Sequence, residues 1–133
     1  MSRRTVLCVG CFDLYHVGHL KHIEAAYDFG TEVVVAVTRD RSVAKGNGRP
    51  VYDENDRMTL IQGIWCVEKV LLVDSSIEAL KKVKPQVFAL GQDYRGKVRK
   101  EDRDYCNRNG VKIAFTNERR MSSSALYDRI RQG

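Results

Sequence analysis

Apolar runs alternate with amphipathic segments along the whole chain. The runs at residues 5–10, 32–38, 67–73, 86–90 and 111–115 have the length and β-branched content of strands that are covered on both faces. Segments with helical spacing of apolar residues lie between them, at about 18–29, from Asp53 onward and at 76–83. A charged, weakly amphipathic stretch follows at about 98–109, and a last helix is expected to begin near Ser122. This alternation predicts one Rossmann-like α/β domain over residues 1–133, with a doubly wound, five-stranded parallel sheet and helices on both faces.

Three local features refine this prediction. Gly30 follows the first helical segment and is expected to end that helix. In the second helix, Met58, Ile61 and Trp65 recur at helical spacing. We expect Trp65 and Phe88 to pack in the core rather than to stack on a ligand.

The composition is that of one globular domain without a membrane segment. The chain has 133 residues, of which 43% are hydrophobic and 30% charged. No run approaches the eighteen or so apolar residues of a membrane span, and the first residues do not resemble a signal peptide. We therefore expect a cytoplasmic protein with no membrane partner.

The net charge of +6 is compatible with nucleic acid, an anionic membrane or a phosphorylated small substrate. Several of the positive residues lie within residues 39–57, where acids interrupt them, unlike a polybasic tail. A phosphate-binding pocket is the more economical interpretation, with a merely solvated surface as the alternative. The basic residues of the later helical segments, such as Lys81, Lys82, Arg99 and Lys100, are expected to be solvated.

Four cysteines are present, and Cys8 and Cys11 form a C-x-x-C pair. Cys8 falls within an apolar strand, where positions three apart point to opposite faces. There is no second cysteine pair at metal spacing, and a thioredoxin-like motif would open a helix instead. We expect buried or half-buried free thiols.

The candidate chemistry follows the first strand, where two histidines flank a glycine at the start of a helix. The segment reads Gly10-Cys11-Phe12-Asp13-Leu14-Tyr15-His16-Val17-Gly18-His19. A helix N-terminus offers amide donors to an anion, and imidazoles there can stabilise charge that develops as a phosphorus–oxygen bond breaks. Zinc is a poor alternative because no third ligand has suitable spacing. His22, one turn after His19, is interpreted as a helix-surface or supporting residue.

These residues carry a family resemblance that covers essentially the whole chain. Gly10 to Asp13 followed by His16-Val17-Gly18-His19 resembles the signature of the HxGH nucleotidylyltransferases, in their cytidylyltransferase-like branch. Three further blocks agree in order and spacing with this family, including its sugar-phosphate adenylyltransferases. They are Gly48 to Val51 with Arg57, Gly91 to Tyr94, and Ser122 to Ser124.

The resemblance implies a set of roles. His16 and His19 would bind the triphosphate and stabilise the transition state, and Lys45 and Arg57 would reach the phosphates or the acceptor. Arg49 would face the acceptor, and Asp40 would be a carboxylate on the acceptor side or on the magnesium side. The nucleotide site would further include Gly10, Cys11, Phe12, Asp13, Gly18, Gly91, Asp93, Tyr94, Ser122, Ser123 and Ser124. Mg²⁺ would accompany the triphosphate, held mainly by phosphate and water.

Two departures from the family pattern bear on the substrate. Asn117 occupies the place of an arginine found in many cytidylyltransferases, and whether Arg119 or Arg120 replaces it is open. Ser123 and Ser124 stand where threonines are usual, which preserves the hydroxyls. The first departure favours slightly the sugar-phosphate adenylyltransferase relatives.

The expected reaction transfers a nucleoside monophosphate from CTP or ATP to a sugar phosphate or polyol phosphate, such as heptose 1-phosphate or glycerol 3-phosphate, with release of pyrophosphate. Relatives are often homodimers, so we expect a homodimer. A dinucleotide-binding dehydrogenase is excluded because Gly10 and Gly18 are eight apart and no G-x-G-x-x-G follows the first strand. A non-catalytic nucleotide- or RNA-binding module remains the alternative, although no aromatic ladder or nucleic-acid motif supports it, and we expect no nucleic-acid partner.

Overall fold

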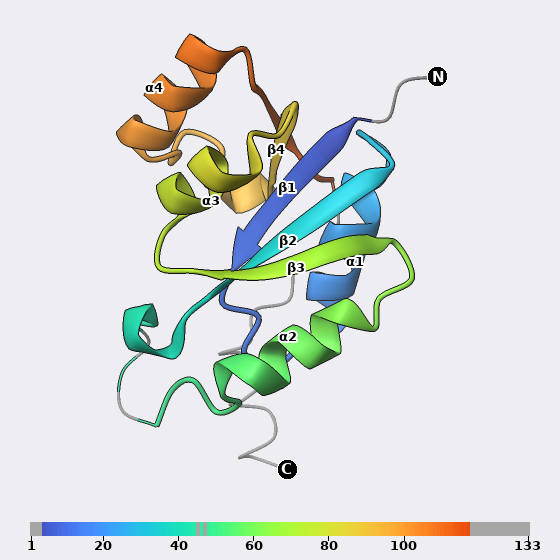
Figure 1. Cartoon of the computed structure of the whole chain (residues 1–133), viewed down its shortest axis with the longest axis vertical. Coiled ribbons are helices and arrows are strands. Elements are labelled where there is room, and N and C mark those ends of the chain that lie inside the picture. The colour runs from blue at the N-terminus through green and yellow to red at the C-terminus, as the bar shows by residue number, and fades with distance from the viewer. Residues whose placement is uncertain (1–3, 45, 47, 118–133) are drawn as a thin grey trace.

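Five parallel strands form one sheet in the order β3-β2-β1-β4-β5. The structure is a computed structural model and describes residues 4–44, 46 and 48–117. The strands are β1 (Thr5–Gly10), β2 (Glu32–Thr38), β3 (Val67–Val73), β4 (Val87–Leu90) and β5 (Lys112–Phe115). The chain moves outward from β1 to β3 and then crosses to the other side of β1, so the strand order reverses between β1 and β4 (Figure 1). The predicted fold class is confirmed.

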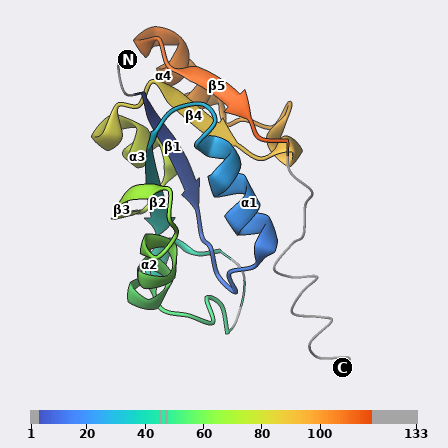
Figure 2. The ribbon, with the colours of Figure 1, turned by 90° about the vertical axis from the view of Figure 1, so that its right-hand side faces the viewer.

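Helices cover both faces of the sheet. The α-helices are α1 (Val17–Ala26), α2 (Glu54–Gln62), α3 (Ser76–Val83) and α4 (Lys100–Asn109), and the short 3₁₀ turns are η1 (Asp40–Ser42) and η2 (Gln92–Tyr94). Helix α1 lies on one side of β1 and α3 on the other (Figure 2). The two faces follow from the alternation of side chains along each strand, since both faces of the central strands are apolar.

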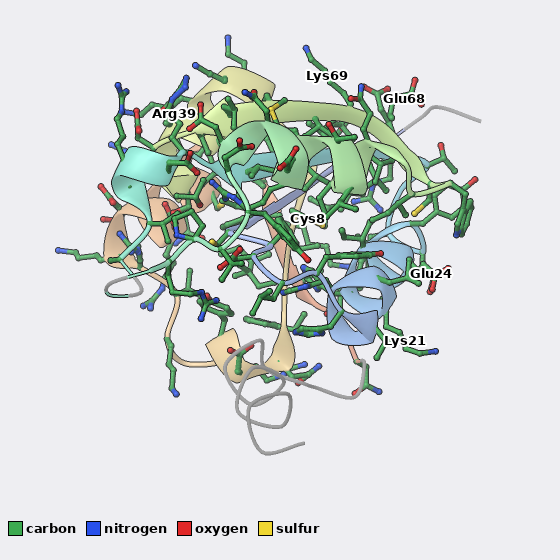
Figure 3. The ribbon with its side chains drawn as sticks, turned by 90° about the horizontal axis from the view of Figure 1, so that it is seen from below. Cys8, Lys21, Glu24, Arg39, Glu68 and Lys69 are labelled. Carbon is green, nitrogen blue, oxygen red and sulfur yellow. The ribbon has the colours of Figure 1, made fainter. Side chains whose placement is uncertain are left out.

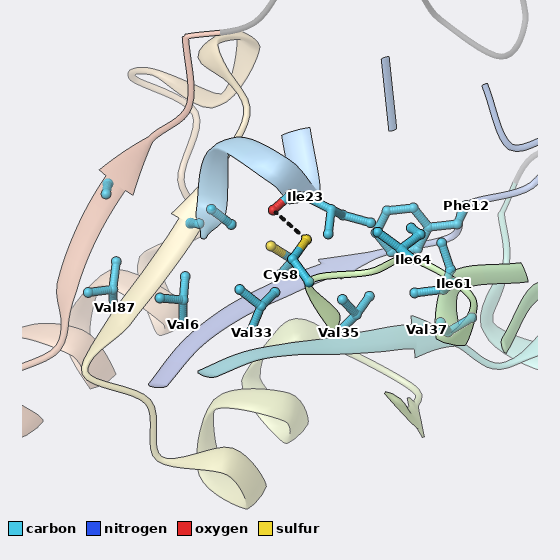
Figure 4. Packing of buried hydrophobic residues seen from close by; sticks show 14 residues of the cluster. Val6, Cys8, Phe12, Ile23, Val33, Val35, Val37, Ile61, Ile64 and Val87 are labelled. Carbon is cyan, nitrogen blue, oxygen red and sulfur yellow. Dashed lines mark hydrogen bonds between the residues drawn. The ribbon is translucent and has the colours of Figure 1, made fainter. Parts of the chain in front are cut away.

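Two apolar clusters make the core. One joins the α1 and α2 face to the sheet through residues such as Cys8, Ile23, Val35 and Ile61 (Figure 4). The other joins α3 and α4 to the opposite face, where Phe88 is buried as expected. Each fully buried aliphatic side chain of this kind contributes roughly 1.5–3 kcal/mol to folding.

The four cysteines are free thiols. Cys8, Cys66 and Cys106 are buried and Cys11 is half-buried, as the sequence predicted. Cys8 lies inside the molecule, whereas Lys21 and Lys69 lie at its periphery (Figure 3). Burial raises the pKa of the Cys106 thiol to about 11, with a further contribution from the nearby Asp102.

Side-chain caps begin α1, α2 and α3 but not α4, and two sequence expectations about helix ends are wrong. Asp53 accepts from the N–H of Asp56, as expected for a cap of α2. Helix α1 ends at Tyr27, and Gly30 does not adopt the left-handed conformation of a C-terminal stop. A Cβ at Gly30 would lie 2.6 Å from the carbonyl oxygen of Arg4, so this glycine instead permits close approach of the chain entering β2 to the residue before β1.

Trp65 is the second correction. Helix α2 ends at Gln62, so Trp65 follows the helix rather than continuing its apolar face. Its side chain is 66% exposed, packs edge-on against Tyr27 and donates from Nε1 to Glu24. The helical spacing that predicted burial therefore ran past the end of the helix.

None of the helices in the described part of the chain is long and apolar enough to cross a membrane. The last predicted helix lies outside the described residues.

Candidate active site at the carboxyl ends of the strands

The loop after β1 leads into α1, whose N-terminus carries the two histidines. His16 is the N-cap residue, and its Nδ1 accepts from the N–H of Gly18 at 3.0 Å. The main-chain N–H of His16 in turn donates to Nδ1 of His19 at 3.1 Å. A ring nitrogen that accepts carries no proton, so each neutral imidazole has its proton on Nε2. The capping of α1 thus fixes the same tautomer in both histidines.

Ring packing holds the two imidazoles in place. The rings of His16 and His19 stack with centroids 3.9 Å apart and an interplanar angle of 21°. Phe12 meets His19 edge-on at 5.4 Å, and Tyr15 stacks on its ring at 5.9 Å. His16 is buried. The sequence predicted the two histidines from their spacing, and the structure brings their rings into direct contact.

Asp13 anchors the loop that precedes the histidines. Its carboxylate is completely buried and accepts from Arg49 Nε at 2.6 Å and from the main-chain N–H groups of Val51 and Tyr52. Burial alone would raise the pKa of Asp13, but the two backbone donors and the Arg49 guanidinium together hold it below its ordinary value. Asp13 therefore ties the loop after β1 to the segment that precedes α2.

The same loop has an unusual backbone. Phe12 and Leu14 have φ values of 55° and 50°, in the left-handed region that costs roughly 1–2 kcal/mol for each such residue. The Phe12 side chain is buried, and a Cβ at Gly10 would lie 3.0 Å from its ring. The burial of Phe12 and the bonds of Asp13 hold this conformation, and Gly10 leaves the space that it needs.

Arg57 connects the loops that follow β1 and β2. Its side chain is fully buried and donates to the carbonyl oxygens of Cys11 and Thr38, each at 2.7 Å, and to that of Tyr52 at 3.1 Å. A further donor, Nη2, pairs with Asp40 at 2.6 Å. The sequence resemblance implied a contact with the phosphates or the acceptor, but here four donor contacts of this guanidinium are to protein groups.

A cavity of about 490 Å³ opens beyond the carboxyl ends of β1 and β4, where the strand order reverses. This is the place where sheets of this kind bind ligands. Its wall includes the end of β1, the loop after β2, the start of α3 and the segment after β4. The lining residues are Val9, Gly10, Cys11, Thr38, Ser42, Val43, Ala44, Asp74, Ser75, Ser76, Phe88, Leu90, Tyr94, Lys97, Val98, Arg99 and Asp102.

Charges of both signs line this cavity. Lys97 and Arg99 contribute exposed cationic side chains. Asp74 is bound by Arg41 through two hydrogen bonds of 2.9 and 2.7 Å and by the hydroxyl of Ser42. These partners hold the pKa of Asp74 well below its usual range. Its charge is thus already matched within the protein, whereas Lys97 and Arg99 give the same wall exposed positive charge, with Arg99 close enough to act on the carboxylate of Asp102.

The predicted site residues fall into three groups. Gly10, Cys11 and Tyr94 line the cavity, and Gly91 and Asp93 belong to the same turn as Tyr94. His16, Gly18, His19, Phe12 and Asp13 form the loop and helix start beside it in the chain, while Arg49 and Asp40 pair with Asp13 and Arg57. Lys45, Arg119, Arg120 and Ser122 to Ser124 lie outside the described residues.

Sequence reasoning missed Ser76 and Asp102, which also line the cavity. Ser76 was interpreted only as the start of a helix, and Asp102 as one charge of an amphipathic segment. Both come from the helices that cover one face of the sheet, and their contact appears only when α3 and α4 pack together. One signal was available in the sequence: Asp102 precedes Cys106 by four residues and therefore shares its buried face of α4.

No group of three or more His, Cys, Asp or Glu side chains within residues 4–44, 46 and 48–117 is arranged to hold a metal ion. The acids closest to the candidate residues are engaged with protein groups, Asp40 and Asp13 with arginines and Asp74 with Arg41.

Comparison with known proteins agrees with this geometry. Residues 7–127 match the cytidylyltransferase-like family. The bifunctional protein HldE of Koribacter versatilis is 41% identical over 97 residues, which are 70% of this chain and 20% of that protein. HldE of Campylobacter curvus is 35% identical over 72% of this chain and 21% of its own length. The chain thus spans about a fifth of the curated relatives that it matches.

Solved structures show the same fold. The lipopolysaccharide core biosynthesis protein of Thermoplasma volcanium is 31% identical with a TM-score of 0.73, and the match covers 90% of this chain and all of that one. Pantothenate synthetase of Thermus thermophilus, at 17% identity and a TM-score of 0.67 over 93% of this chain and 61% of its own, shares the fold alone.

Proposed function

The chain belongs to the cytidylyltransferase-like family of nucleotidyltransferases, and we propose that it transfers a nucleoside monophosphate from ATP or CTP to a small phosphorylated acceptor. An oxygen of the acceptor phosphate attacks the α-phosphorus in line, and the bond from that phosphorus to pyrophosphate breaks. A phosphate monoester is largely dianionic near neutral pH, so the attack needs no strong general base. Catalysis is then orientation and charge stabilisation, as in other phosphoryl transfers.

The observation that carries this proposal is the shared tautomer of His16 and His19. Because both Nδ1 atoms accept from main-chain N–H groups, each ring offers its N–H at Nε2, a suitable donor to phosphate oxygens. The N-terminus of α1 adds the positive end of a helix dipole at the same place. We assign the triphosphate to this end of α1 and the acceptor to the adjoining cavity.

The other predicted residues divide between ligand contact and support. Gly10, Cys11, Tyr94, Asp93 and Gly91 border the bound molecules. Asp13 and Arg49 fix the loop that carries the histidines, and Arg57 with Asp40 does the same from α2, so these four act as positioning residues. Lys45 and Ser122 to Ser124 remain proposed phosphate ligands on the family resemblance.

The acceptor is proposed to be a sugar phosphate or a polyol phosphate. The likeness to HldE and to a lipopolysaccharide core biosynthesis protein supports this class, because core oligosaccharides are built from sugars. Mg²⁺, entering with the triphosphate, would neutralise charge on its phosphates. We further propose a cytoplasmic homodimer.

The proposal is tested by pyrophosphate release. ATP or CTP with Mg²⁺ is combined with glycerol 3-phosphate or a hexose 1-phosphate, and thermal stabilisation by each triphosphate is measured in parallel. We expect one triphosphate to stabilise the protein and to release pyrophosphate only when an acceptor is present. If no triphosphate binds and RNA binds with steep salt dependence, the non-catalytic binding module replaces this proposal.

A further inference from the structure

One buried carboxylate in the cavity is only half satisfied. Asp102 on α4 is 3% exposed, and its Oδ2 accepts from the hydroxyl of Ser76 on α3 at 2.5 Å. Its Oδ1 is buried and has no hydrogen-bond partner among the described residues. A buried carboxylate oxygen without a donor is costly, so such an atom is expected to meet a ligand or a water molecule.

The surroundings of Asp102 indicate which kind of ligand could reach its carboxylate. Asp102 and Ser76 line the cavity together with Phe88 and Leu90 of β4, while Lys97 and Arg99 add positive charge to the wall. An acceptor phosphate is attracted to these cations, and the remainder of the acceptor then lies against apolar and acidic groups. The cavity therefore combines a place for an anion with a separate hydrogen-bond acceptor.

We propose that Asp102, held by Ser76, is a specificity residue that accepts a hydrogen bond from a hydroxyl group of the acceptor. This inference rests on the proposed function and assigns to one residue the recognition of an acceptor hydroxyl group. An ammonium group is the competing partner, because a carboxylate also attracts a cation, and the experiment below therefore includes an acceptor of that kind. A hydroxyl is compatible with the carboxylate in either protonation state, since it can donate to the ion or accept from the acid.

A purely structural role for the same contact predicts something different. If the Ser76–Asp102 hydrogen bond only joined α3 to α4, its removal would lower stability and would change turnover of all acceptors by the same factor. If Asp102 instead selects a hydroxyl group, its removal should change the ratio of kcat/KM between acceptors with and without that hydroxyl. That ratio is the readout.

The experiment compares glycerol 3-phosphate, propyl phosphate and phosphoethanolamine as acceptors, with pyrophosphate release as the signal. Propyl phosphate has the same number of carbons as glycerol 3-phosphate but lacks its hydroxyls. We expect the wild type to prefer glycerol 3-phosphate over propyl phosphate by roughly 10- to 100-fold in kcat/KM, the range for a buried hydrogen bond that is left unmade. Asp102→Leu should reduce this preference to near one, mainly through KM.

Two variants and a control separate the explanations. Asp102→Asn keeps an acceptor oxygen and should retain part of the preference, and Ser76→Ala, which removes the group that orients the carboxylate, should weaken it. Asp104→Asn, an exposed acid on the same helix, should leave it unchanged. Melting temperatures and the thermal shift with the triphosphate show that each variant is folded and binds nucleotide.

The outcomes distinguish the two levels of the proposal. A wild type that is stabilised by neither triphosphate, and that releases pyrophosphate neither with these acceptors nor with a hexose 1-phosphate, overturns the proposed function. A wild type that is active but prefers propyl phosphate or phosphoethanolamine overturns the role of Asp102 alone. The same holds if folded Asp102→Leu keeps the wild-type ratio.

Discussion

Arg57 and Asp40 form an ion pair of 2.6 Å in which the arginine side chain is fully buried and the carboxylate is 40% exposed. The same guanidinium also donates to main-chain carbonyl groups of the loops after β1 and β2. Arg57 was expected to contact a ligand, but instead it connects the loop after β1 to the loop after β2, beside the candidate site. Its exposed partner, Asp40, is the member of the pair that a ligand can approach.

Removal of Arg57 should destabilise the fold before it affects chemistry. Arg57→Met leaves the carbonyl oxygens of Cys11, Thr38 and Tyr52 without their donor. We expect the free energy of unfolding to fall by about 3–5 kcal/mol, mainly because these carbonyl groups lose a donor, while the half-exposed pair with Asp40 contributes little. Urea unfolding measures this loss, and Arg108→Met, at an exposed position on α4, is the matched control. A variant with wild-type stability and only a raised KM for triphosphate would instead assign Arg57 to phosphate binding.

Substitutions at the two histidines can separate helix capping from catalysis. Asn at position 16 can still accept from the N–H of Gly18, and Gln at position 19 can accept from the N–H of His16, as in a capping box. Neither provides the imidazole N–H at Nε2. We expect His16→Asn and His19→Gln to unfold near the wild-type temperature but to lose about 100-fold in kcat, the usual effect of removing one such donor.

The control for these variants is Lys21→Gln, an exposed residue of α1, which should change neither property. Single-turnover rates with saturating triphosphate give the chemical step. Near-normal turnover in either folded histidine variant would contradict the proposed role of that ring.

Asp13 should make stability depend on acidic pH. Its pKa is lowered in the folded state from an ordinary value of 3.8. The stabilisation it provides is therefore complete above that ordinary value and is lost as the pH falls through the lower, folded-state pKa. At pH 7, Asp13→Asn should reduce the free energy of unfolding by about 3 kcal/mol, since it breaks a buried pair with Arg49.

The direction of this pH dependence is tested by measuring the difference in unfolding free energy between wild type and Asp13→Asn at a series of pH values from 7 to 3. The difference should be constant near neutrality and shrink at the acidic end. Asp28→Asn, at an exposed position after α1, supplies the comparison. A difference that grows as the pH falls would show that Asp13 is protonated in the folded protein.

Two glycines should respond in opposite ways to alanine. A Cβ at Gly30 would lie 2.6 Å from a main-chain oxygen of Arg4, so Gly30→Ala must displace backbone and should cost roughly 1–3 kcal/mol. A Cβ at Gly63 has its nearest contact at 3.5 Å, and Gly63 has a helical φ of −76°. Gly63→Ala should be neutral or stabilise by up to about 1 kcal/mol, because it restricts the unfolded chain.

Thermal unfolding of the two alanine variants under identical conditions decides this point. Equal melting temperatures would mean that the chain between α1 and β2 can move away from Arg4 without cost.

The sequence by itself determined the elements and their order. Strands 5–10, 32–38 and 67–73 have the predicted bounds, because continuous β-branched runs fit only a sheet that is covered on both faces. The histidines were found for a similar reason, since the spacing of His16, Gly18 and His19 is local and the start of α1 places them together. The bounds of these strands and the placement of the two histidines depend mainly on residues close together in the sequence, so local patterns predict them.

Only the tertiary structure decided how distant residues are paired. That Arg57 turns inward to Cys11 and Thr38, and that Asp102 meets Ser76, depends on loops and helices far apart in the chain. Trp65 was misplaced because helical spacing does not state where a helix ends, and Gly30 because the approach of Arg4 is a contact across elements. The partners of a buried charge are set by packing, and packing is a property of the whole fold rather than of any one segment.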